Sequence, residues 1–168
     1  VADTDPLDLE PGAHDFVLHA LALHWANDPV GQIAQARRAL RPDGLFLGVL
    51  FAGDTLRELR EALAGAEIEL LGGLSPRVAP MGEIRDLGGL LQRAGLALPV
   101  ADGLRFDVTY PDAFRLMRDL RAMGETSGLA GPVRPLTRDI AARAAALYTE
   151  RFGDAEGRIP ATFEIISL

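Results

Sequence analysis

The stretch HDFVLHALALHWANDPVGQIAQARRALRPDGLFLGVLF, residues 14–51, decides the fold of this chain. It contains two apolar runs, at 16–18 and 45–51, in which polar residues do not alternate with apolar ones. Such runs are typical of strands that are buried on both faces of a parallel sheet. The stretch therefore predicts two strands of this kind.

The residues between the two runs predict a helix. Asp28 suits the N-cap and Pro29 suits the first helical position, while the turn at 42–44, Pro-Asp-Gly, ends the helix. A strand, a helix and a second strand joined by short links form a right-handed parallel unit. This unit is the building block of doubly wound α/β folds.

A second helix is expected directly after these strands, with Asp54 as its N-cap. Apolar residues recur on one face of this helix, and charged residues occupy the remaining positions. We expect Glu58, Glu61, Glu67 and Glu69 to form a solvated charged face.

The rest of the chain predicts three more helices and two more strands. Apolar spacing predicts helices at 84–91, 111–124 and 137–148, each ended or preceded by Gly, Pro or a capping Thr. Alternation at 104–110 predicts a strand with one wet face at a sheet edge, and 161–168 reads as a final strand. The predicted architecture is a mixed four-stranded sheet flanked by helices.

Composition limits the classes of function. The 168 residues carry a formal net charge of -7, so a nucleic-acid partner is not expected, because such binding needs clustered Lys and Arg. The chain has no Cys, which excludes disulfides and thiolate chemistry. No apolar run is long enough for a membrane span and no signal peptide is evident, so we expect a cytoplasmic protein.

Several kinds of site lack support in the sequence. His14, His19 and His24 are five residues apart, and on a strand this spacing puts neighbours on opposite faces, so we predict no metal site. The chain contains neither the Gly-x-Ser-x-Gly elbow of hydrolases nor a glycine-rich phosphate loop.

The deciding stretch resembles the fourth strand, following helix and fifth strand of class I S-adenosylmethionine-dependent methyltransferases, with Asp15 and the Pro-Asp-Gly turn in matching places. The opening VADTDPLDL resembles the segment after the third strand of that fold, and Asp3 matches an Asp that reaches the adenine. The runs GGLSPRVAP, LMRDLRAMGETSGL and ATFEIISL resemble the methyltransferase-like proteins related to the mitochondrial complex I assembly factor, together with their bacterial relatives.

The resemblance implies a partial Rossmann-like methyltransferase fold with S-adenosylmethionine as the cofactor of the intact protein. It implies no specific catalytic residue, because the cofactor is already an activated electrophile and the protein mainly aligns the reactants. The cofactor-side residues are expected to be Asp3, Thr4 and His19. Expected on the substrate side are His24, Trp25, Arg77, Arg121 and Glu125. Ordinary structural roles, such as salt bridges or packing, are the alternative for each of them.

The resemblance also implies that residues 1–168 are the C-terminal part of one domain, cut before the glycine-rich cofactor loop, with a helical insertion at about 70–100 and 111–153. We expect the fragment itself to bind the cofactor weakly and to be inactive. Its apolar edge strand is expected to favour a homodimer. The acceptor is expected to be a small molecule or a protein. The alternative is a non-catalytic assembly factor or a relative of the protein-arginine hydroxylases.

Overall fold

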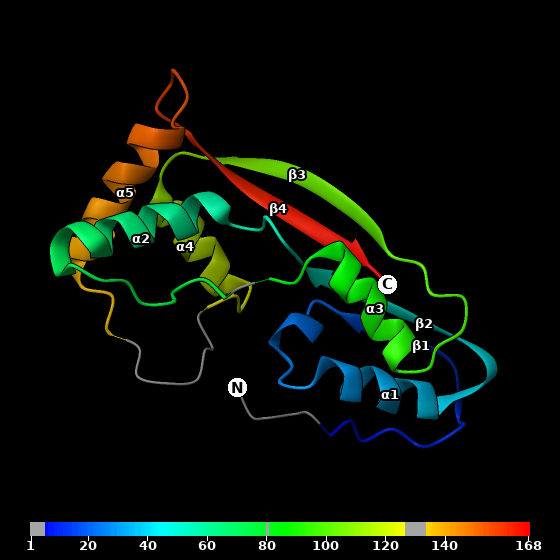
Figure 1. The fold of residues 1–168 in the computed structure, drawn as a ribbon. Coiled ribbons are helices and arrows are strands. Elements are labelled where there is room, and N and C mark those ends of the chain that lie inside the picture. Colours follow the sequence, from blue (N-terminus) through cyan, green and yellow to red (C-terminus); the bar gives the residue numbers. More distant parts are fainter. Residues whose placement is uncertain (1–5, 80, 127–133) are drawn as a thin grey trace. The chain divides into compact units, whose positions relative to one another are not determined.

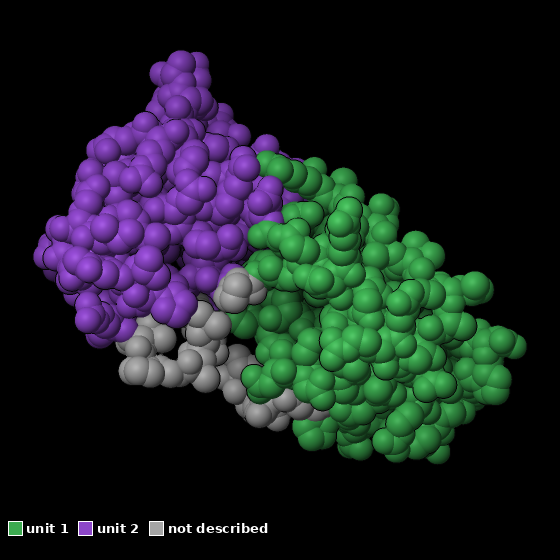
Figure 2. Space-filling model, in the orientation of Figure 1, with its two compact units in different colours: residues 1–53, 81–105, 164–168 green, residues 54–80, 106–163 purple. Residues whose placement is uncertain are grey.

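The computed structural model describes residues 6–79, 81–126 and 134–168. Figure 1 shows the elements in chain order. The predicted cofactor-side residues Asp3 and Thr4 lie outside the described residues. The described residues divide into two compact units, which Figure 2 colours separately. Unit 1 comprises 1–53, 81–105 and 164–168, and unit 2 comprises 54–80 and 106–163.

The first two strands are parallel, as the sequence predicts. β1 (His14–Ala20) pairs with β2 (Leu40–Phe51), and Ala20 lies opposite Val49 at their carboxyl ends. Between them lies α1 (Pro29–Ala39), whose first turn is capped because the Asp28 carboxylate accepts a hydrogen bond of 2.8 Å from the Gly31 amide. Together these elements form the predicted parallel unit.

The sheet has four strands among the described residues, in the order β1-β2-β4-β3. β4 (Ile159–Ser167) pairs antiparallel with β2, with Leu50 opposite Ile166, and β3 (Asp102–Tyr110) lies at the edge beyond β4. A mixed four-stranded sheet is thereby confirmed. The alternating residues of β3 are mostly exposed, as expected for an edge strand with a wet face.

In unit 1, α1 and α3 (Ile84–Arg93) supply apolar side chains that pack against the sheet. The prediction that the first strand is buried on both faces is wrong for this chain, because Phe16 is 48% exposed and Leu18 is 55% exposed. Val17, between them, packs against the core cluster. Only one face of β1 is therefore covered by described residues, and β1 is an edge strand of the described sheet.

Unit 2 contains α2 (Arg57–Leu71), α4 (Ala113–Ala122) and α5 (Arg138–Phe152). Thr137 caps α5 and Asp112 caps α4 through their side-chain oxygens. Their buried side chains form the apolar interior of the unit and include Leu59, Leu63, Leu116, Leu120, Ile140, Leu147 and Tyr148. α3 falls within the predicted insertion at 70–100 but belongs to unit 1.

The start of α2 differs from the predicted one. Its N-cap is Leu56 rather than Asp54, and Leu56 has a left-handed backbone with φ of 55°. Leu56 is buried, and its amide donates to the Thr162 carbonyl at 2.8 Å. Burial of Leu56 and its hydrogen bond to β4 fix the start of the helix. The helix therefore begins two residues later than it would with Asp54 as the N-cap.

The solvated glutamate face predicted for α2 is wrong in two places. Glu58 is only 2% exposed and Glu67 is 0% exposed. Each has donors that compensate for burial: Thr162 and Arg57 at Glu58, and Arg77 at Glu67. A buried carboxylate is tolerated when it is hydrogen-bonded and paired.

The Glu58 carboxylate predicts how stability depends on pH. Burial favours its neutral form, but hydrogen bonds from the Thr162 hydroxyl, from backbone amides and from the Arg57 guanidinium outweigh burial and lower its pKa below 4.5. The ionised carboxylate therefore stabilises the fold above about pH 4.5, and this contribution disappears as the pH falls through the lowered pKa.

We expect the E58Q variant to lose about 1–3 kcal/mol of unfolding free energy at neutral pH, since a hydrogen-bonded charge is replaced by an amide whose NH2 group faces a donor. Urea unfolding at neutral and acidic pH measures this difference. It should shrink below about pH 4.5. A difference that is the same at both pH values would contradict the role of the ionised carboxylate.

Candidate functional site

The carboxyl ends of the two parallel strands form the candidate site in unit 1. Ligands of open α/β sheets bind beyond the carboxyl ends of the strands. At this edge β1 ends at Ala20, and the amide of Leu21 donates to the Val49 carbonyl of β2 at 2.7 Å. Leu21 has a positive φ of 49°, which is strained for a residue with a side chain. Such strain is often found at functional sites.

Aromatic rings gather at this edge. The short helix η1 (Leu23–Trp25) follows β1 and places the His24 ring 5.4 Å from the Trp25 ring. The His24 ring also lies 5.3 Å from the ring of Phe51, the last residue of β2, at an interplanar angle of 66°. Parallel pairing of β1 with β2 thus brings together rings that are far apart in sequence, and they can form an apolar wall beside a ligand.

His19 lies one residue before the end of β1 and contacts α1. Its Nε2 is 2.9 Å from Oε1 of Gln32, a buried residue of α1. Because an amide oxygen accepts a hydrogen bond, Nε2 of the neutral ring carries the proton and Nδ1 is the acceptor. Nδ1 is buried and has no hydrogen-bond partner among the described residues. An orphaned acceptor of this kind suits the N–H or O–H donor of a ligand.

The structure brings three of the predicted residues into unit 1, namely His19, His24 and Trp25. Phe51 and Gln32 join them and were not predicted. A usable signal for Phe51 was its position as the last apolar residue of the second strand. Gln32 carried no signal, because a lone glutamine in a helix is usually solvated.

The remaining predicted substrate-side residues belong to unit 2. The Arg77 guanidinium donates from Nε to Glu67 Oε1 at 2.8 Å and from Nη1 to the Arg134 carbonyl at 2.9 Å, and its side chain is only 9% exposed. These contacts hold the loop after α2. Arg121 is exposed on α4, and Glu125 follows that helix, where its amide donates to the Leu120 carbonyl.

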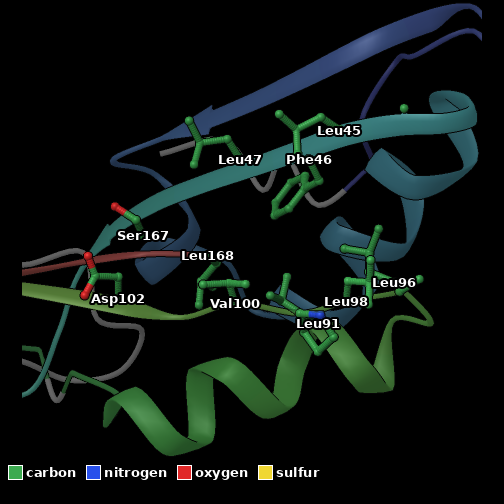
Figure 3. A pocket seen from close by; sticks show the side chains of 13 residues that line it. Leu45, Phe46, Leu47, Leu91, Leu96, Leu98, Val100, Asp102, Ser167 and Leu168 are labelled. Carbon is green, nitrogen blue, oxygen red and sulfur yellow. The ribbon is translucent and has the colours of Figure 1, made fainter.

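A separate cavity of about 300 Å³ lies at the amino-terminal half of β2 in unit 1. Leu45, Phe46, Leu91 and Leu98 line it, and Asp102 is its one charged side chain (Figure 3). Its lining includes the hydroxyl of Ser167 but no histidine. The chemistry-bearing residues lie at the opposite end of the strand, so this cavity is not the candidate site.

Two other kinds of feature are absent from the described residues. No cluster of three or more His, Cys, Asp or Glu side chains suited to a metal ion occurs in residues 6–79, 81–126 and 134–168. Within the same ranges, no helix is both long enough and apolar enough to cross a bilayer.

Known proteins resemble this chain in sequence. A family model described as "Methyltransferase domain" matches residues 1–48. The arginine-hydroxylase NDUFAF5, mitochondrial, of Danio rerio is 40% identical over 99% of this chain and 52% of its own length. The malonyl-[acyl-carrier protein] O-methyltransferase of Laribacter hongkongensis is 39% identical over 98% of this chain and 53% of its own length. The chain spans about half the length of the curated relatives it matches.

Solved structures resemble the fold. A candidate methyltransferase from Bacillus halodurans C-125 superposes with a TM-score of 0.56 at 13% identity, covering 99% of this chain and 73% of that one. The YcgJ protein of Bacillus subtilis superposes with a TM-score of 0.54 at 12% identity, covering 97% of this chain and 66% of that one. At these identities the likeness concerns the fold alone.

Proposed function

Because this chain belongs to the class I S-adenosylmethionine-dependent methyltransferase family, we propose that the protein containing it transfers a methyl group to a carboxylate or a protein side chain. The observation that carries the proposal is the parallel pairing of β1 with β2, which gathers His19, His24 and Trp25 at the carboxyl edge of the sheet. The methyltransferase family model and the malonyl-carrier-protein relative support the same reaction type.

The residues at this edge fit part of S-adenosylmethionine. The orphaned Nδ1 of His19 can accept a hydrogen bond from an amino or hydroxyl group of the cofactor. The rings of His24, Trp25 and Phe51 offer faces that can attract the sulfonium charge next to the acceptor. Asp3 and Thr4 are proposed cofactor contacts on the resemblance alone.

When bound, S-adenosylmethionine supplies a methyl group on a positively charged sulfur, which leaves as a neutral thioether. The task of the chain is then to orient the reactants and exclude water. Trp25 and His24 are proposed to cover the acceptor, and His19 is proposed to bind the cofactor. A carboxylate acceptor needs no general base, which agrees with the lack of an assigned catalytic residue.

Titration calorimetry of the full gene product with S-adenosylmethionine tests the proposed cofactor. We expect saturable binding at micromolar ligand. No heat at millimolar ligand would favour the non-catalytic assembly role instead, in which the same fold acts by binding a partner.

Mass spectrometry tests the reaction. The acceptors are a malonyl carrier protein and an arginine-containing peptide, each incubated with the gene product and S-adenosylmethionine. We expect a gain of one methyl group on one of them. A gain of one oxygen atom on arginine, with molecular oxygen and a reductant present, would instead support hydroxylation. Hydroxylation is the second candidate because relatives that are 40–42% identical are named arginine-hydroxylases.

Two further features remain proposals. We propose that the exposed edge of β1 pairs with a second copy of the chain when nothing else covers it, and light scattering that finds only monomer would contradict this. The cytoplasmic location also stays a prediction. Several of the similar proteins are named as mitochondrial.

A further inference from the structure

The outer face of α4 differs in charge from the chain as a whole. Arg115, Arg118 and Arg121 recur every three residues along this helix, and all of them are exposed. Residues three apart lie on one face of a helix, so the guanidinium groups form a stripe. The chain has a net charge of -7, and this stripe is therefore a local exception to an acidic protein.

The arginines of the stripe are available to a partner. The inner face of α4 packs through Ala113, Leu116 and Leu120, which are at most 6% exposed. None of the three arginines forms an ion pair with another residue in the part of the chain that the structure describes. By contrast, the Arg143 guanidinium on α5 pairs with Glu69 and Glu150.

A large apolar side chain lies within the same face. Phe114 is 52% exposed, and helical periodicity places it between the directions of Arg118 and Arg121. Aromatic residues and arginines are enriched at the energetically important centres of protein interfaces. An exposed phenyl ring among guanidinium groups is therefore suited to a surface that offers both carboxylates and an apolar side chain.

We propose that the face of α4 formed by Phe114, Arg115, Arg118 and Arg121 docks an acidic protein segment. Arginine binds carboxylates through paired hydrogen bonds, and the ring of Phe114 takes an apolar side chain between them. Nucleic acid suits this face less well, since it offers no aliphatic side chain to the exposed ring of Phe114. This docking surface goes beyond the proposed methyl transfer and does not depend on it.

Fluorescence anisotropy of a labelled acidic peptide tests the surface by measuring how tightly the peptide binds the 168-residue chain. In this peptide, single Glu residues alternate with pairs of Leu residues. We expect the R118E/R121E variant to weaken binding by at least roughly tenfold, and the milder R118Q/R121Q variant to weaken it less. We expect F114A to weaken binding as well, and its effect should persist at high salt, where the arginine contribution is screened.

A matched control separates the stripe from overall charge. Arg38 and Arg93 are exposed helical arginines of unit 1, so R38E/R93E changes the net charge by the same amount. We expect this control to change binding by less than about twofold. Circular dichroism checks that each variant is folded. Equal weakening by both double variants, no detectable binding of the peptide, or tighter binding of single-stranded DNA than of the peptide would overturn the proposal.

Discussion

Replacing Glu67 with alanine is expected to lower the free energy of unfolding by about 3–5 kcal/mol, because the change leaves the charge of Arg77 buried without its partner. The Glu67 side chain is 0% exposed and that of Arg77 is 9% exposed. Glu67 also accepts a hydrogen bond from the Ser75 amide, so the variant loses a contact to the loop after α2 as well. Urea unfolding monitored by circular dichroism measures the loss.

The exposed ion pair between Glu69 and Arg143 is the matched control, since it joins the same helix, α2, to α5. E69A should have a far smaller effect, because water solvates the arginine that it leaves behind. The E67A/R77A double variant should recover part of the stability that E67A loses, since no unpaired buried charge remains. Equal losses of unfolding free energy in E67A and E69A would contradict the prediction that burial of the Glu67–Arg77 pair makes it important for stability.

The L50A variant is expected to lose about 2–5 kcal/mol of unfolding free energy, because truncating a buried leucine removes apolar contacts and leaves a cavity. Leu50 is 2% exposed on β2 and packs in the same core cluster as Leu23, Leu87 and Ile166. Chemical denaturation measures the loss.

L45A is the control for this prediction, because Leu45 lies on the same strand and is 62% exposed. Five residues along a strand reverse the face, so the two leucines point to opposite sides. The control should change stability by less than about 1 kcal/mol. Similar losses for L45A and L50A would contradict the strand assignment of β2.

The elements that the sequence predicted well have local causes. Asp28 followed by Pro29 is a strong start signal for a helix, and the continuous apolar run at 45–51 predicted a strand, although Leu45 on its outer face is 62% exposed. The alternation at 104–110 likewise identified an edge strand. These signals act within a few residues of the chain, so tertiary structure did not override them.

The predictions that were wrong depended on distant residues. The burial of Glu58 follows from the Thr162 hydroxyl, which is 104 residues away in sequence, and no local pattern reveals such a donor. Gln32 was overlooked at the candidate site for the same reason, since only the fold brings it to His19. Exposure of Phe16 depends on what covers the outer face of β1, which local periodicity does not report.

The site at the carboxyl ends of β1 and β2 is best tested through Trp25, the one tryptophan of this chain. S-adenosylhomocysteine is titrated into the full gene product and into its W25F variant while tryptophan fluorescence is recorded. We expect a saturable change in fluorescence that the variant lacks, at a ligand concentration that also saturates in calorimetry. Saturable heat with identical fluorescence changes in both proteins would place the ligand elsewhere and contradict the account.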